Sequence, residues 1–127
     1  MIDYGEKMKI LVTGSSGFLG NYLCRYLSQR NYFVFAHTRC FEQINSINIE
    51  NINFDLRNDS DKINIPHIDI IIHCAGRAHI LNDQSVDPFA EFRKVNVEGT
   101  LKLARKALDK KVKRFIFMSS IGVNGSV

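Results

Sequence analysis

Long apolar runs are missing from this chain of 127 residues. No stretch approaches the roughly 18 consecutive apolar residues that a membrane-spanning helix requires, so we expect no membrane partner. The first residues, MIDYGEK, are polar and include acids, which argues against a secretory signal peptide. Met8 stands immediately before the first predicted strand, so residues 1–8 are expected to be a leader.

Cysteine is also scarce, with Cys24, Cys40 and Cys74 as an odd set of three. None of them stands at a spacing typical of a metal site or of a redox pair. The four histidines are not spaced as metal ligands either, and His73 is interpreted as a structural residue at the end of a strand. The pattern favours a reducing cytoplasm, and we expect no metal site.

The net charge of +4 comes with a concentration of cations between Lys102 and Arg114. No aromatic side chain alternates with these cations, whereas sites for single-stranded nucleic acid combine the two. The segment is therefore interpreted as a solvated helix face, and we expect no nucleic-acid partner. The apolar fraction of 45% supports a globular core, and the length suits one domain, residues 1–127.

Strand-like and helix-like segments alternate along the whole chain, without a repeat or a linker. This alternation predicts an α/β fold with a Rossmann-like, doubly wound parallel sheet. Periodicity and turn residues place strands at 9–13, 33–37, 49–55, 68–75 and 113–119, and helices at 17–29 and 88–108. Such sheets bind ligands beyond the carboxyl ends of their strands, so residues that follow a strand are site candidates.

Apolar spacing predicts which surfaces are buried. The run IDIIIHCA at 68–75 is apolar almost throughout, so burial on both faces is expected. The side chains predicted to face the core from the first helix are Leu19, Leu23, Tyr26 and Leu27. Asp87 is predicted to cap the long helix that follows it.

The segment KILVTGSSGFLG at 9–20 joins an apolar strand directly to three glycines. Gly14 permits a tight turn, Gly17 lets backbone come close to a phosphate, and Gly20 lets the next helix pack closely on the sheet. That helix begins at about Gly17, so its free N–H groups face the same point. The pattern predicts a site for the pyrophosphate of a dinucleotide.

The glycines have the spacing G-x-x-G-x-x-G after a threonine, not the commoner G-x-G-x-x-G. In this respect the chain resembles the extended branch of the short-chain dehydrogenase/reductase superfamily. The resemblance implies a Rossmann-like fold and a nicotinamide dinucleotide cofactor. It also implies that Phe18 and Leu19, at the start of the helix, belong to the cofactor site together with the three glycines.

Thr38 and Arg39 follow the second predicted strand, where an NAD-binding unit usually has an acidic residue for the ribose hydroxyls. Arg39 could instead bind a 2′-phosphate, stack on the adenine, or lie on the surface without a ligand. The cofactor is therefore predicted to be NAD, with NADP left open.

Asp55 and Leu56 follow the third predicted strand. In the superfamily an aspartate and an aliphatic residue hold the adenine at this point; the alternative is that Asp55 only caps the next turn. Cys74, Ala75 and Gly76 follow the fourth strand and resemble the end of the H-x-A-(A/G) signature. That resemblance implies that the nicotinamide half of the cofactor lies against their backbone.

Two later segments match the superfamily in the same order. VNVEGT resembles its N-V-x-G-T element, and the match implies that Asn96 helps to fix the cofactor loop and the active-site geometry. FIFMSSIGVNG places Ser120 at the catalytic Ser/Thr position and Ser119 beside the nicotinamide. Ser120 would then hydrogen-bond the substrate oxygen and orient it for hydride transfer. The alternative is a pair of strand-end serines that make turn bonds.

Within the superfamily the chain looks most similar to NAD-dependent epimerase/dehydratase proteins, in particular to UDP-glucose and UDP-N-acetylglucosamine 4-epimerases. This implies a nucleotide-sugar substrate and, in the full-length enzyme, a homodimer formed in part by the helix from Pro88. The family's acid/base is the tyrosine of Tyr-x-x-x-Lys, and no tyrosine here has lysine four residues later. We therefore expect the incomplete N-terminal part of an enzyme, truncated after about the fifth strand and inactive alone.

Two alternatives to an epimerase or dehydratase follow from the same residues. One is a Rossmann protein that senses a nucleotide and does not catalyse. The other is an NADP-dependent reductase of the same superfamily.

Overall fold

Five parallel strands form one sheet in the computed structural model, which describes residues 7–39, 43–58, 62–75 and 87–118. The strands are β1 (Lys9–Thr13), β2 (Phe33–Thr38), β3 (Ile49–Asn53), β4 (Ile70–His73) and β5 (Arg114–Phe117). Their order is β3-β2-β1-β4-β5, and every neighbouring pair is parallel. This confirms the predicted Rossmann-like sheet, in which the order reverses between β1 and β4.

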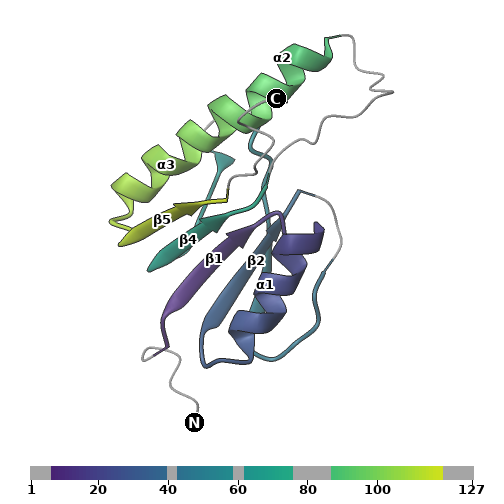
Figure 1. The fold of residues 1–127 in the computed structure, drawn as a ribbon. Coiled ribbons are helices and arrows are strands. Elements are labelled where there is room, and N and C mark those ends of the chain that lie inside the picture. The colour runs from purple at the N-terminus through teal and green to yellow at the C-terminus, as the bar shows by residue number, and fades with distance from the viewer. Residues whose placement is uncertain (1–6, 40–42, 59–61, 76–86, 119–127) are drawn as a thin grey trace, which may run out of the picture.

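Within the described ranges, four helical segments accompany the sheet: α1 (Phe18–Ser28), α2 (Pro88–Arg93), η3 (Lys94–Gly99) and α3 (Thr100–Asp109). Figure 1 shows α1 over β1 and β2, whereas α2 and α3 belong to one long rod beside β4 and β5. The chain crosses the sheet in opposite directions from β1 to β2 and from β4 to β5, so right-handed connections place the helices on opposite faces. Among the described residues, no helix is long and apolar enough to cross a membrane.

The core under α3 begins with one row of side chains across the sheet. Phe35, Leu11, Ile71 and Phe115 occupy paired positions on neighbouring strands, so their side chains share a face. Leu11 and Ile71 are completely buried there, and Leu103 of α3 packs against the same cluster. Burying side chains of this size contributes roughly 2 kcal/mol each, which holds α3 on the sheet.

The opposite face is buried under α1 but becomes more exposed toward β5. Val12, Ile72 and Ile116 are in register, yet Val12 is completely buried, Ile72 is half-buried and Ile116 is 41% exposed. In Figure 1, α1 covers β1 and β2, and no described helix covers this face of β4 and β5. The prediction that 68–75 is buried on both faces is therefore confirmed only in part, because Ile70 and Ile72 are partly buried on this face.

The face of α1 that packs on the sheet agrees with the prediction only in part: Leu23 and Leu27 pack against the core as predicted. Gly20, Cys24 and Ser28 are buried, whereas Leu19 and Tyr26 are about two-fifths exposed. The helix is rotated because Gly20 is held against the turn that precedes α1. A close backbone contact at one glycine therefore outweighs the apolar stripe in setting the orientation of the helix.

The structure divides the long helix that the sequence predicts. Asp87 Oδ1 accepts from the N–H of Ala90 at 3.1 Å, which confirms the predicted cap, but η3 in the middle is π-helical. Thr100 Oγ1 donates to the carbonyl of Asn96 at 2.9 Å, and the N–H of Thr100 bonds to Val97 instead. An α-helix would pair this N–H with the carbonyl of Asn96, which here accepts from the Thr100 hydroxyl.

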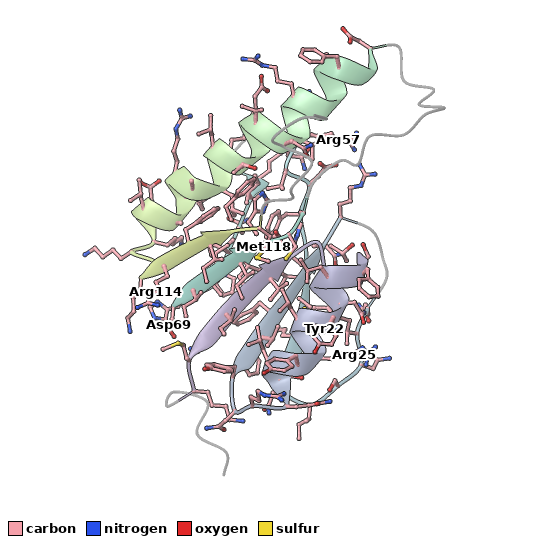
Figure 2. The ribbon with its side chains drawn as sticks, in the orientation of Figure 1. Tyr22, Arg25, Arg57, Asp69, Arg114 and Met118 are labelled. Atoms are coloured by element: carbon pink, nitrogen blue, oxygen red, sulfur yellow. The ribbon has the colours of Figure 1, made fainter. Side chains whose placement is uncertain are left out.

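Asp69, just before β4, forms hydrogen bonds that link the amino-terminal ends of three strands. Its Oδ2 accepts from the N–H of Lys9 at 2.9 Å, and its carbonyl accepts from the N–H groups of Lys113 and Arg114. The hydrogen bond from Lys9 holds the pKa of Asp69 below its usual range. Figure 2 shows Asp69 beside Arg114, at the end of the sheet away from Arg57. One residue thus joins β1, β4 and β5.

Candidate functional site

A cavity of about 280 Å³ lies at the carboxyl ends of the strands, where the strand order reverses. Open parallel sheets bind their ligands at this position. Its described walls are Gly14, Ser16, Gly17, His37, Thr38, Arg39, Phe54, Asp55, Leu56, Cys74, Ala75 and Val95. They come from segments far apart in the sequence, so only the assembled sheet creates the cavity.

Two of the three glycines are needed for the backbone geometry. Gly14 has φ of +74°, where residues with a side chain are strained, and a Cβ there would lie 2.8 Å from backbone atoms of Ala75. A Cβ on Gly20 would lie 2.0 Å from the carbonyl oxygen of Gly14. The tight turn and the close packing of α1 therefore have the predicted geometry.

Gly17 differs from the other two because the fold has room for a side chain there. A Cβ at Gly17 would meet only the carbonyl oxygen of Gly14, at an ordinary 3.4 Å. Gly17 is the N-cap of α1, and no side chain makes a capping bond. The first N–H groups of the helix and its positive dipole end therefore face open space beside the cavity, which suits an anionic group.

His37 ties the glycine turn to β2 and β3. Its Nδ1 accepts from the N–H of Gly14 at 3.3 Å, so its Nε2 carries the proton and donates to the carbonyl of Phe54 at 2.8 Å. The ring also stacks on Phe54, with 3.8 Å between ring centroids. Burial lowers the pKa of His37 to about 4, so the imidazole is neutral at pH 7.

His73 makes a second buried connection, from β1 to the long helix. Thr13 Oγ1 accepts from the N–H groups of Cys74 and Ala75, so its own proton goes to His73 Nδ1 at 2.7 Å. His73 Nε2 then donates to Thr100 Oγ1 at 2.9 Å, the hydroxyl that bonds to Asn96. Burial lowers the pKa of His73 to about 4, and the prediction of a structural histidine is confirmed.

Asp55 lines the cavity and is also bound by its own neighbour. Asp55 Oδ2 accepts from Arg57 Nη2 at 2.8 Å, and Oδ1 accepts from the backbone N–H of Arg57 at 2.9 Å. The hydrogen bonds from the Arg57 side chain hold the pKa of Asp55 below its usual range. Asp55 therefore caps the turn that follows it, as the alternative interpretation predicted. It also lies in the cavity wall.

The end of β2 presents the guanidinium of Arg39 and the hydroxyl of Thr38 to the cavity, and Ser16 of the glycine turn adds a second hydroxyl. Arg39 is exposed at the rim, and Thr38 is 2% exposed. Thr38 Oγ1 lies 3.4 Å from Ser16 Oγ, to which it donates a long hydrogen bond. The carbonyl of Thr38 accepts from Asn53 Nδ2 at 3.0 Å, which orients this strand end against β3.

The structure brings half of the predicted site residues together in one wall. The residues that line the cavity are Gly14, Gly17, Arg39, Asp55, Leu56, Cys74 and Ala75. Gly20 lies beneath the turn, and Asn96 lies in η3 beside the wall residue Val95. Their predicted contacts with a cofactor stay predictions.

Phe18 and Leu19 turn their side chains away from the cavity. Phe18 is 94% exposed and lines a separate groove along α1, and Leu19 is 41% exposed. Any contribution to the predicted site would therefore come from their backbone N–H groups in the first turn of α1. Gly76, Ser119 and Ser120 lie outside the described residues.

Sequence reasoning did not assign Thr13, Ser16 or His37 to the site. Thr13 and His37 are polar residues at the ends of otherwise apolar strands, and such a position predicts a place at the carboxyl edge of the sheet. Their hydrogen-bond partners come from other strands, which no local pattern reveals. Ser16 carried no comparable signal, because serine is ordinary in a turn.

No group of three or more His, Cys, Asp or Glu side chains is positioned for a metal ion within the described ranges. Cys24 and Cys74 are both free thiols. Burial raises the pKa of Cys24 to about 12 and also raises that of Cys74. Both are therefore protonated, unreactive thiols at neutral pH.

Comparisons with known proteins agree with this geometry. Residues 10–127 match the sequence profile of the NAD-dependent epimerase/dehydratase family. A UDP-glucose 4-epimerase from Vibrio cholerae is 36% identical over 118 residues, and one from Klebsiella pneumoniae is 35% identical over 131 residues. The crystal structure of a UDP-galactose 4-epimerase superposes with a TM-score of 0.78 and 26% identity.

These similarities cover nearly all of this chain but different shares of the other proteins. The match with the Vibrio cholerae protein spans 91% of this chain and 36% of that protein. The match with the Klebsiella pneumoniae protein spans 93% of both. The solved epimerase is matched over 93% of this chain and 40% of its own length.

Proposed function

This chain belongs to the NAD-dependent epimerase/dehydratase family, and on that premise we propose that it is the dinucleotide-binding part of a nucleotide-sugar epimerase or dehydratase. The supporting observation is the cavity at the reversal of strand order, into which the glycine turn, the end of β2 and the residues after β3 and β4 converge. Its size and edges suit part of a dinucleotide, whose remainder would extend along the open rim.

Each wall fits one part of such a cofactor. The uncapped start of α1 at Gly17 suits the pyrophosphate, and Asp55 with Leu56 suits the adenine. The small residues Cys74 and Ala75 leave backbone accessible to the nicotinamide half. A bound nicotinamide dinucleotide would supply the hydride acceptor for oxidation at the sugar ring. These assignments follow the family's motifs and are supported by the positions of the residues.

The remaining expectations extend this proposal beyond the described residues. Ser120 would orient the substrate oxygen, with Ser119 beside the nicotinamide and a nucleotide sugar as the substrate. A full-length protein would form a homodimer through the long helix, because Val97, Leu101 and Leu108 are exposed along it. Sedimentation of the full-length protein as a monomer at micromolar concentration would contradict that assembly.

The free thiols support a cytoplasmic location.

The test is calorimetric titration of the 127-residue protein with NAD and with NADP. We expect a dissociation constant of about 1 mM or tighter for at least one of them. Gly17→Val should weaken binding by at least about tenfold, because the added side chain occupies the anion position, and its Cβ meets only the carbonyl oxygen of Gly14 at an ordinary distance. Gln29→Val, at the exposed far end of α1, is the matched control and should bind like the unchanged protein.

The same preparation is expected to leave UDP-glucose unchanged in a coupled assay with excess cofactor. None of the tyrosines in the sequence is followed by lysine four residues later, so the family's acid/base pair is absent from this chain. Steady conversion of UDP-glucose to UDP-galactose would refute this expectation. A folded protein that binds neither dinucleotide would refute the function itself.

A further inference from the structure

We propose that the outward face of α1 binds single-stranded nucleic acid. A groove of about 680 Å³ runs along this helix. Its described walls are Ser16, Gly17, Phe18, Asn21, Tyr22, Arg25, Tyr26, Gln29 and Arg30. The groove shares Ser16 and Gly17 with the cavity at the strand ends, but none of its aromatic or basic side chains lines that cavity. The inference is therefore independent of the dinucleotide function proposed above.

Two neighbouring rows of side chains form the groove. Residues four apart on an α-helix lie in one row, about 6 Å apart along the axis. The members of the aromatic row are Phe18, Tyr22 and Tyr26. The members of the polar row are Asn21, Arg25 and Gln29. The helix thus presents flat rings beside hydrogen-bond donors over about 12 Å of its length.

The aromatic row is open to a ligand. Phe18 is 94% exposed, Tyr22 is 58% exposed and Tyr26 is 39% exposed. The rings of Tyr22 and Tyr26 stack on each other, with 5.9 Å between ring centroids. Rings that are already ordered lose little conformational freedom when a ligand binds. A nucleobase of any identity can stack on an exposed ring, which makes such a row a platform for a single strand.

Two guanidinium groups are held beside these rings. Arg25 Nε donates to Asn21 Oδ1 at 3.1 Å, which leaves the other N–H groups of this guanidinium to bind an anion. The guanidinium of Arg30 lies 3.5 Å from the centroid of the Tyr26 ring, and its Nη1 donates to the carbonyl of Tyr26 at 3.3 Å. A phosphodiester that follows the groove would therefore meet charged donors next to the stacking surface.

The charge of this part of the chain suits a polyanion. No aspartate or glutamate stands between Glu6 and Glu42, so α1 and the strands on either side of it carry no acidic side chain. A second copy of the chain, docked through the same face, would bring arginines against arginines. An acidic protein segment would satisfy the arginines but has no need of regularly spaced rings, whereas a single strand alternates phosphates with flat bases.

The proposal changes one expectation from the sequence. The cations between Lys102 and Arg114 have no aromatic residues among them, and for that reason the sequence predicted no nucleic-acid partner. In α1 the two kinds of residue are combined on one exposed face. The combination is visible only once the orientation of α1 on the sheet is known, because Tyr26 was predicted to face the core.

The first test is fluorescence anisotropy of a labelled strand of about fifteen thymidines, titrated with the 127-residue protein in about 50 mM NaCl. We expect a dissociation constant of about 100 μM or tighter. Tyr22→Ala should weaken binding by about tenfold, because one stacking ring is lost from an exposed position of the helix. Phe89→Ala is the matched control, since Phe89 is 74% exposed on α2, and it should bind like the unchanged protein.

The second test measures the dependence of binding on salt. Arg25→Met keeps a long side chain and removes its charge, so the slope of log affinity against log salt concentration should decrease by about 0.7. Arg114→Met is the matched control, because Arg114 is also exposed but lies on β5, far from Tyr22 and Arg25 on α1 (Figure 2). It should leave the slope unchanged.

The alternatives give different results in the same assays. A folded protein that does not bind the strand overturns the proposal, and so does equal weakening by Tyr22→Ala and Phe89→Ala. Equally tight binding of the corresponding duplex, whose bases are not free to stack on the rings, overturns the stacking platform. Equally tight binding of polyglutamate overturns it in favour of an acidic protein partner. Binding that survives Tyr22→Ala and is displaced by NAD places the strand in the dinucleotide cavity and overturns the groove.

Discussion

Replacing Gly20 by alanine is expected to destabilise the protein by about 4 kcal/mol, enough to leave much of a small domain unfolded. The new Cβ would lie 2.0 Å from the carbonyl oxygen of Gly14. Backbone cannot rotate away as a side chain can, so α1 would have to move off the turn and lose its packing on β1 and β2. Urea unfolding followed by circular dichroism measures the change in the free energy of unfolding.

Gly17→Ala is the matched control on the same turn. Its Cβ would meet the same carbonyl oxygen at 3.4 Å, and its backbone is extended, with φ of −78°. We expect a cost of about 0.5 kcal/mol, from the poorer N-cap alone. Equal destabilisation by the two alanines would show that general loss of glycine flexibility, and not the close contact, explains the effect at Gly20.

Acidification from pH 8 to pH 5 is expected to lower the free energy of unfolding by about 4 kcal/mol, about 2 kcal/mol for each buried imidazole. Burial lowers the pKa values of His37 and His73 to about 4, whereas unfolded histidine titrates near 6.5. The unfolded state therefore binds more protons between these values. The stability is complete above pH 6.5 and is lost as the pH falls toward 4.

Single substitutions separate the two histidines. The slope of unfolding free energy against pH between 5 and 6 should correspond to about two protons taken up on unfolding, and to about one in His73→Asn. The slope is independent of any general loss of stability in the variant. An unchanged slope in His73→Asn would show that His73 is not a buried neutral base. Because Asp55 and Asp69 have lowered pKa values, their contributions are lost at still lower pH and do not enter this window.

Much of the fold was predictable because its signals are local. The strand boundaries near Lys9 and Phe33, the start of α1 near Gly17 and the cap at Asp87 all agree with the structure. Each depends on neighbouring residues only: an apolar run, a glycine turn, or a side chain that reaches an N–H three residues ahead. The parallel, doubly wound character of the sheet followed from the alternation of elements and from the general handedness of their connections.

The errors arose where a single close contact, and not apolar periodicity, decides the outcome. The exposure of Leu19 and Tyr26 follows from the contact between Gly20 and Gly14, which rotates α1. The π-helical segment ends beside Thr100, whose hydroxyl accepts from His73 Nε2 and donates to the carbonyl of Asn96. Neither contact leaves a periodic mark in the sequence.

The sequence by itself determined the order of strands and helices and the motif that places three glycines at the first turn. These are consequences of local backbone preference and of side-chain periodicity. Only the tertiary structure decided that Ser16, His37 and Val95 share the cavity with the predicted wall residues, because these side chains meet through the strand order and not through spacing along the chain. Only the tertiary structure, likewise, made His37 and His73 neutral, because burial among strands lowers their pKa values.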